Sequence, residues 1–112
     1  MNHSEVVKSQ AHIVIELIEY IPNSILSRTI MKKTTGNVTA YSLDSGEGLT
    51  EKTSPFDTFV QIIDGEAEII IDSTSNELRT GEGIVIPAHR PHAIKANERF
   101  KMILTIIKSG YE

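Results

Sequence analysis

Residues 81–92 read Gly-Glu-Gly-Ile-Val-Ile-Pro-Ala-His-Arg-Pro-His, and this stretch decides the predicted fold. Its glycines indicate a turn, and residues 84–86 are apolar and β-branched, which is typical of a short strand. Pro87 ends that strand, because proline has no N–H group to donate to a neighbouring strand. His89 follows in a loop, and His92 stands at the start of another short strand. The stretch therefore predicts two strands joined by a loop that carries histidine.

On both sides of this stretch the chain alternates between apolar and polar residues, with frequent turn signals. Asp64-Gly65 is a strong hairpin signal, and residues 73–76 form a polar turn. Many short strands with frequent turns are typical of an all-β sandwich or barrel. Residues 12–20 fit a short helix or a strand equally well, and Pro22 ends either element. The expected strands are residues 24–33, 37–43, 58–63, 66–71, 84–86, 92–95 and 100–107.

The composition limits the possible functions, because the chain has 112 residues, no cysteine and a net charge of −4. This length fits a polar segment over residues 1–11 followed by a single barrel domain over residues 12–112. The lack of cysteine excludes a disulfide scaffold and a thiol nucleophile. The negative charge argues against nucleic-acid binding, and no apolar run reaches the ~18–20 residues that span a bilayer. Residues 1–10 show no signal peptide, so a cytoplasmic location is expected.

Two stretches of the chain resemble the sequence motifs of cupins. Residues 81–92 resemble the second motif, G-x5-P-x-G-x2-H-x3-N, with matching spacings between its first glycine, its proline and its histidine. Residues 46–65 resemble the first motif, G-x5-H-x-H-x3,4-E-x6-G, with glycine at both ends. The 15 residues between them, 66–80, resemble the short spacing of small microbial cupins. The resemblance implies a double-stranded β-helix (a jelly-roll barrel), usually dimeric, with a pocket at the barrel mouth.

Most of the metal-binding positions of the cupin motifs carry other residues in this chain. In the family, two histidines and a glutamate of the first motif and one histidine of the second bind a divalent metal. Here the two histidine positions of the first motif carry Lys52 and Ser54. The glutamate position carries Thr58 by strict counting, or Asp57 if the loop shifts by one residue. His92 is the single match.

A reduced metal site could still be assembled from His92, His89 and Asp57, with Glu51 as an outside candidate. His89 stands at a glycine position of the second motif, which counts against a left-handed turn there. A transition-metal site generally needs three or more imidazole or carboxylate donors, and Lys52 is a cation that repels a divalent ion. We therefore expect an incomplete site and no cofactor, with a divalent transition metal as the alternative.

Lys52, Asp57 and His92 also fit a metal-free binding site, because the resemblance implies that all three project towards the barrel mouth. Lys52 would hold a carboxylate or phosphate with His92 as a second donor, or would form a solvated ion pair with Asp57. Gln61 alternates with Phe59 and is either a pocket hydrogen-bonding group or a paired residue on a sheet face. The residues expected to form the apolar pocket wall are Phe59, Ile63, Ile69, Ile86 and Ile94.

Three functions fit these residues, and the fold alone does not choose among them. The first is a cupin that binds or senses a small, anionic molecule in its barrel pocket. The second is a metal-dependent cupin enzyme, of the dioxygenase or isomerase type, with an atypical ligand set. The third is a structural or partner-binding domain. The residues leave open whether the protein is an enzyme.

The last expected strand, residues 100–107, predicts a homodimer. One of its faces is fully apolar and the other is half apolar, since Ile103 and Ile107 alternate there with Lys101 and Thr105. A small chain has little material to cover both faces of such a strand, and a second subunit would supply the rest. We expect the two copies to meet through the N-terminal strand and the half-apolar faces.

Overall fold

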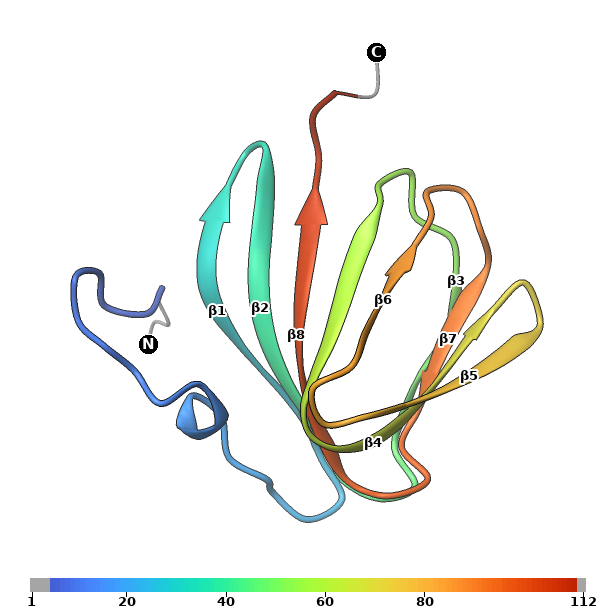
Figure 1. Ribbon diagram of the computed structural model, residues 1–112, viewed down its shortest axis with the longest axis horizontal. Coiled ribbons are helices and arrows are strands. Elements are labelled where there is room, and N and C mark those ends of the chain that lie inside the picture. Colours follow the sequence, from blue (N-terminus) through green and yellow to red (C-terminus); the bar gives the residue numbers. More distant parts are fainter. Residues whose placement is uncertain (1–4, 111–112) are drawn as a thin grey trace.

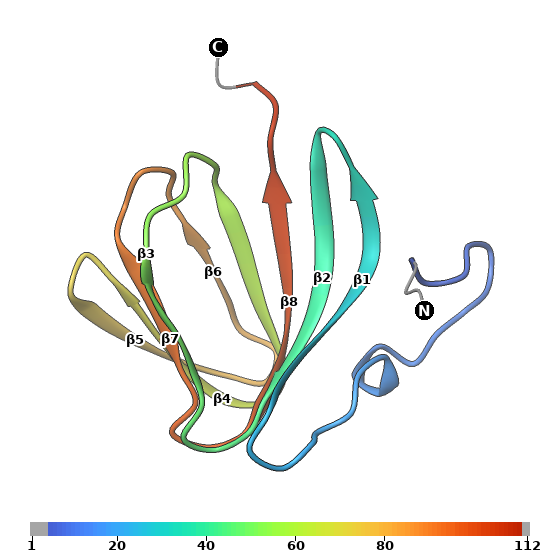
Figure 2. The same ribbon diagram turned by 180° about the vertical axis from the view of Figure 1, so that it is seen from behind.

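The computed structural model describes residues 5–110, which form antiparallel strands and one turn of 3-10 helix, η1 (Val14–Glu16). Figures 1 and 2 show the strands curling into a barrel that is open at one end. The predicted all-β jelly-roll fold is confirmed. No helix in this part of the chain is long and apolar enough to cross a membrane. The strands are β1 (Ile25–Lys33), β2 (Gly36–Leu43), β3 (Gly48–Lys52), β4 (Thr58–Ile71), β5 (Thr74–Arg79), β6 (Gly83–Ile86), β7 (His92–Lys95) and β8 (Phe100–Ile107).

Strand β4 belongs to both sheets of the barrel. Residues 58–65 of β4 pair with β8, and residues 58–61 also pair with β6 on the other side. Residues 66–71 pair with β5, and residues 68–71 also pair with β7. We call β1, β2, β8, β6 and the first part of β4 sheet A, and we call β3, β7, β5 and the second part of β4 sheet B. The two sheets face each other across the barrel (Figure 1).

The predicted hairpin at Asp64-Gly65 is wrong, because the chain passes through these residues as one continuous strand. The pairing of β4 with β8 shifts between Ile62 and Asp64, which marks a bulge, and Gly65 has a φ of +89°. A Cβ atom on Gly65 would lie 2.4 Å from the carbonyl oxygen of Arg99. Hairpin turns and bulges both use residues with positive φ. The Asp-Gly pair therefore marks the place where β4 bends from sheet A into sheet B.

The hairpin that follows β4 turns at Asp72 and Ser73, so the predicted turn at residues 73–76 is misplaced. These two residues have φ angles of 51° and 66°, and two consecutive left-handed residues fit a two-residue turn of type I′. The chain then returns as β5, a strand absent from the sequence prediction. Leu78 is the only apolar residue of β5, and it is buried. One apolar residue is too few to produce an alternating pattern.

The hydrophobic core lies between the inner faces of the two sheets. The apolar face predicted for residues 100–107 points into it, and Phe100, Met102 and Leu104 are all buried. The remaining buried apolar residues of this core come from β2, β4, β5, β6 and β7 and from the residue after β7. They are Leu43, Val60, Ile62, Ala67, Ile69, Leu78, Ile86, Ile94 and Ala96.

Residues 13–20, which we call the N-terminal segment, pack on the outer face of sheet A (Figures 1 and 2). Ile18 is 6% exposed and packs with Ala40 of β2 and Ile103 of β8. The chain itself thus covers the half-apolar face of β8 at Ile103, whereas Ile107 is exposed. Of the helix or strand predicted for residues 12–20, only the single turn η1 forms. The predicted homodimer stays a prediction.

Tyr20, at the end of the N-terminal segment, forms a hydrogen bond to the bend of β4 at Asp64. Its hydroxyl donates a 2.7 Å hydrogen bond to Asp64. The Arg99 guanidinium lies 4.4 Å and the Lys101 ammonium 4.9 Å from the centre of its ring, within the range of cation–π contacts. Burial, followed by the hydrogen bond to Asp64 and the negative charge of that residue, raises the pKa of Tyr20. The hydroxyl therefore stays protonated and keeps donating at neutral pH.

Candidate ligand pocket

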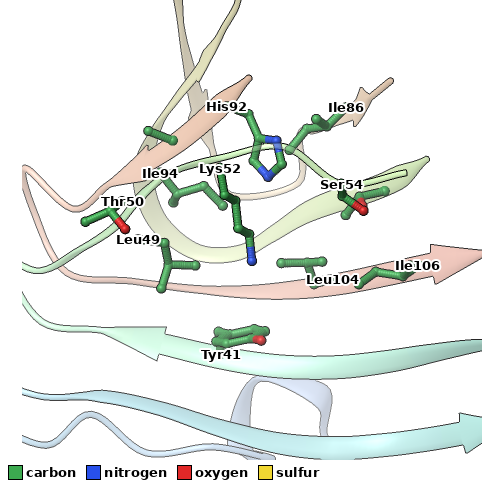
Figure 3. Close-up of a pocket in the computed structure, with 12 residues that line it drawn as sticks. Tyr41, Leu49, Thr50, Lys52, Ser54, Ile86, His92, Ile94, Leu104 and Ile106 are labelled. Carbon is green, nitrogen blue, oxygen red and sulfur yellow. The ribbon is translucent and has the colours of Figure 1, made fainter. Parts of the chain in front are cut away.

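A pocket with a cavity volume of about 80 Å³ lies between the two sheets (Figure 3). Most of its wall is aliphatic, and a few polar side chains interrupt it. Within residues 5–110, no aspartate or glutamate lines this pocket. The apolar lining residues are Leu49, Ile86, Ala93, Ile94, Leu104 and Ile106, and the polar ones are Tyr41, Thr50, Lys52, Ser54, Thr58 and His92.

The four chain positions that align with the metal ligands of the cupin motifs all line this pocket. They carry Lys52 at the end of β3, Ser54 in the following loop, Thr58 at the start of β4 and His92 at the start of β7. Thr58, the residue given by the strict count of the first motif, is buried and lines the pocket, whereas Asp57, the alternative, is not among the lining residues. Residues distant in sequence are thus brought to one place by the pairing of β3 with β7 and of β7 with β4.

Lys52 supplies a cation to the pocket. It lies opposite His92 in the pairing of β3 with β7. Figure 3 shows its side chain reaching across the pocket, with the ammonium group directed towards Leu104 and Tyr41. Among residues 5–110, no side chain or backbone group forms a hydrogen bond or ion pair with this ammonium. Lys52 is an exposed residue, so its ammonium is accessible from solvent, and an anion that enters the pocket would be attracted to this positive charge.

His92 supplies the second polar anchor, and one of its ring nitrogens is already occupied. The side chain is 6% exposed, and its Nδ1 lies 3.2 Å from the carbonyl oxygen of Arg90. A carbonyl oxygen only accepts hydrogen bonds, so Nδ1 carries the proton and donates. In the neutral ring the other nitrogen, Nε2, is then a hydrogen-bond acceptor.

The loop between β6 and β7 is held in place on two sides. On one side, Asp72 pairs with the Arg90 guanidinium and donates its backbone N–H to the carbonyl oxygen of Pro91 at 2.9 Å. On the other side, His89 donates its backbone N–H to the carbonyl oxygen of Ser54 at 2.7 Å. His89 has a φ of +65°, so this glycine position of the motif keeps its left-handed backbone, contrary to the expectation from its side chain. These contacts fix the carbonyl group that orients the His92 ring.

Four of the predicted site residues lie outside this pocket. Asp57 is exposed, and its Oδ1 accepts a 2.8 Å hydrogen bond from the backbone N–H of Ala88, which supports the loop after β6. His89 is exposed in that loop. Phe59 and Gln61 lie on the outer face of sheet A, where they line a groove beside the N-terminal segment. Gln61 is thus a sheet-face residue, the second of its two predicted placements.

Two of the five residues of the predicted apolar wall line this pocket. Ile86 and Ile94 line the pocket, Ile69 is buried in the core, and Ile63 lies on the outer face of sheet A with Phe59. The sequence interpretation missed the pocket residues Tyr41 and Thr50. In β2, Tyr41 stands among small and apolar residues on both faces, so alternation gave no sign of which face is inside. Strand β3 was absent from the sequence prediction, because Leu49 is its only apolar residue.

The residues of the pocket do not form a donor set that suits a transition metal. His92 is the only imidazole, and no carboxylate lines the wall within the described residues. No cluster of three or more histidine, cysteine, aspartate or glutamate side chains capable of holding a metal occurs in residues 5–110. Protein sites for these metals generally use at least three such donors. The Lys52 ammonium, with its positive charge, is a further mismatch.

Comparison with known proteins places the chain among small barrel proteins. A family model described as "Cupin domain" matches residues 41–107. A conserved protein of unknown function from Streptococcus pyogenes is 32% identical, with a TM-score of 0.90 over 98% of this chain and 97% of that protein. A cupin superfamily protein from Desulfitobacterium hafniense DCB-2 is 27% identical, with a TM-score of 0.88 over 97% and 100% of the two chains.

A cupin 2 conserved barrel domain protein from Leptotrichia buccalis is 35% identical, with a TM-score of 0.81. That match covers 84% of this chain and 46% of the other protein. No curated protein matches the sequence.

Proposed function

The chain belongs to the cupin domain family, and from this premise we propose that it binds a small anion in the barrel pocket without a transition metal. The observation that carries the proposal is the Lys52 ammonium, which reaches into a pocket without carboxylates and has no partner within residues 5–110. Lys52 is an exposed residue of a chain with net charge −4, and its positive charge, without a partner among residues 5–110, favours an anion as its partner.

The size of the pocket supports a small ligand. Its volume of about 80 Å³ is far below the roughly 300–1,000 Å³ of pockets that hold drug-sized molecules. A short-chain carboxylate, with its carboxylate group on Lys52 and its carbon atoms against Ile86 and Leu104, uses both parts of the wall. Hydroxyl groups of Ser54 and Thr58 are further donors for the carboxylate oxygens.

Replacing Lys52 by methionine is expected to weaken binding of the anion by about tenfold or more, or ~1.4 kcal/mol, because a charge-assisted hydrogen bond is lost. Methionine keeps most of the aliphatic stem and removes the charge. Calorimetric titration with acetate, propanoate and inorganic phosphate would measure the effect. The matched control is Lys33→Met, since Lys33 is an exposed lysine at the end of β1, outside the pocket. Unchanged affinity in Lys52→Met, or equal losses in both variants, would contradict the proposal.

The metal-dependent alternative is opposed by the donor set, and metal analysis tests it directly. We expect protein purified without a polyhistidine tag and without added metal to hold far less than one transition-metal ion per chain. His92→Ala should leave that content unchanged, because a single imidazole is too few donors for a stable site. Near-stoichiometric iron, manganese, nickel or zinc that disappears in His92→Ala would show that the alternative is correct.

A further inference from the structure

We propose that the ligand is a small 2-hydroxy acid, whose carboxylate binds Lys52 and whose hydroxyl group donates a hydrogen bond to Nε2 of His92. This inference rests on the proposed function and adds to it a second, neutral recognition element. It assigns different chemistry to the two anchors of the pocket, a cation for the carboxylate and an acceptor for the hydroxyl.

The acceptor character of His92 follows from its surroundings. Nδ1 donates to the carbonyl oxygen of Arg90 at 3.2 Å, so a neutral ring presents a lone pair at Nε2. Arg90 is held by its ion pair with Asp72, and the adjoining Pro91 carbonyl accepts the backbone N–H of Asp72. The carbonyl group that fixes the ring is therefore itself fixed. If Nε2 faced a carboxylate oxygen of the ligand, two hydrogen-bond acceptors would meet without a proton between them. A hydroxyl group of the ligand can instead donate its proton to Nε2.

The two anchors belong to neighbouring residues in the barrel wall. Lys52 and His92 are directly opposite each other on adjacent antiparallel strands, where side-chain Cβ atoms are about 4.5–5.5 Å apart. Figure 3 shows both side chains entering the same pocket. A small molecule that carries both a carboxylate and a hydroxyl group would present one partner to each anchor. The small cavity volume, about 80 Å³, favours a molecule of this size over a longer chain.

Calorimetric titration of the wild-type protein with lactate and with propanoate tests this inference. The two acids differ by the hydroxyl group alone. At about pH 8 we expect lactate of one enantiomer to bind about tenfold more tightly than propanoate, because its hydroxyl group adds a hydrogen bond. His92→Asn should bring the two affinities within about twofold, because an amide can still donate to the Arg90 carbonyl but lacks the group at the Nε2 position. Lys52→Met should weaken binding of both acids.

The outcomes separate this inference from the proposed function. If both acids bind with equal affinity and both need Lys52, the binding function holds and the hydroxyl preference is wrong. If neither acid nor phosphate binds, both proposals fail. Nitrogen-15 NMR of the His92 ring provides a test independent of the variant: the inference requires that Nδ1 carry the proton, and a ring protonated at Nε2 alone would overturn it.

Discussion

Replacing Gly65 by alanine is expected to destabilise the fold by about 3–5 kcal/mol, from backbone strain and steric overlap together. Gly65 has a φ of +89° at the bend where β4 leaves sheet A for sheet B. A Cβ atom there would lie 2.4 Å from the Arg99 carbonyl oxygen and 3.0 Å from Cα of Phe100. Both neighbours are backbone atoms beside the buried Phe100, so they cannot move aside without displacing β8.

Comparing the free energies of chemical unfolding of Gly65→Ala and Gly46→Ala would separate backbone strain from steric overlap. Gly46 has nearly the same φ, +88°, but nothing lies within 4 Å of a Cβ atom placed on it. We expect Gly46→Ala to cost only about 1–2 kcal/mol, from backbone strain alone. Equal losses in the two variants would mean that the close approach of β4 and β8 is unimportant for stability.

Replacing Ile18 by alanine is expected to reduce the free energy of unfolding by about 2–4 kcal/mol, because it leaves a cavity between the N-terminal segment and sheet A. Ile18 is nearly completely buried against Ala40 and Ile103. The hydrogen bonds from Ser42 to the Glu19 carbonyl, 2.7 Å, and from Tyr20 to Asp64 hold the same segment in place. The segment is thus expected to behave as part of the folded unit.

The matched control for Ile18→Ala is Ile13→Ala, in the same segment. Ile13 is 63% exposed, and its truncation should change the free energy of unfolding by no more than about 0.5 kcal/mol. The midpoint and slope of urea unfolding, followed for both variants, would measure the difference. If both variants unfold like the wild type, the packing of the N-terminal segment adds nothing to stability.

The sequence predicted the structure best where a local pattern, such as an apolar run that ends at a proline, agreed with the spacing of the cupin motifs. The short strand before Pro87, the strand at residues 92–95 and the apolar face of residues 100–107 all appear in the structure as predicted. Motif spacing also placed Lys52 and His92 together, although 40 positions separate them (92 − 52). Spacing succeeded there because the pairing of β3 with β7 sets which residues meet, whatever their chemical type.

Alternation failed in the first part of β4 for a physical reason. Thr58, Val60 and Ile62 point inwards, while Phe59 and Gln61 point outwards. Both sets contain large apolar residues, because the N-terminal segment covers part of the outer face of sheet A. A pattern with two apolar faces does not reveal which one is inside, and a shift of one residue exchanges them. For that reason the sequence predicts Phe59 in the pocket wall and leaves Gln61 between the pocket and the sheet face.

The hairpin error at Asp64-Gly65 has a physical origin. The sequence rule identifies residues that tolerate positive φ, and such residues occur both where a strand reverses and where it bends. Only the pairing partners distinguish the two, and those partners lie far along the chain in β7 and β8. A short window of sequence around Asp64-Gly65 does not contain these distant partners, so it cannot show whether the strand reverses or bends.

The position of β8 between β2 and β4 also bears on how the chain is made. Both neighbours precede it in sequence, and among residues 5–110 β8 is the strand that pairs with both of them. While the ribosome is still adding the residues before Phe100, the facing edges of β2 and β4 have no strand between them. Unpaired edges of this kind recruit other chains. Among the strands of residues 5–110, the one that closes sheet A is therefore the last to be synthesised, and a chain that stalls before Phe100 would expose two unpaired strand edges.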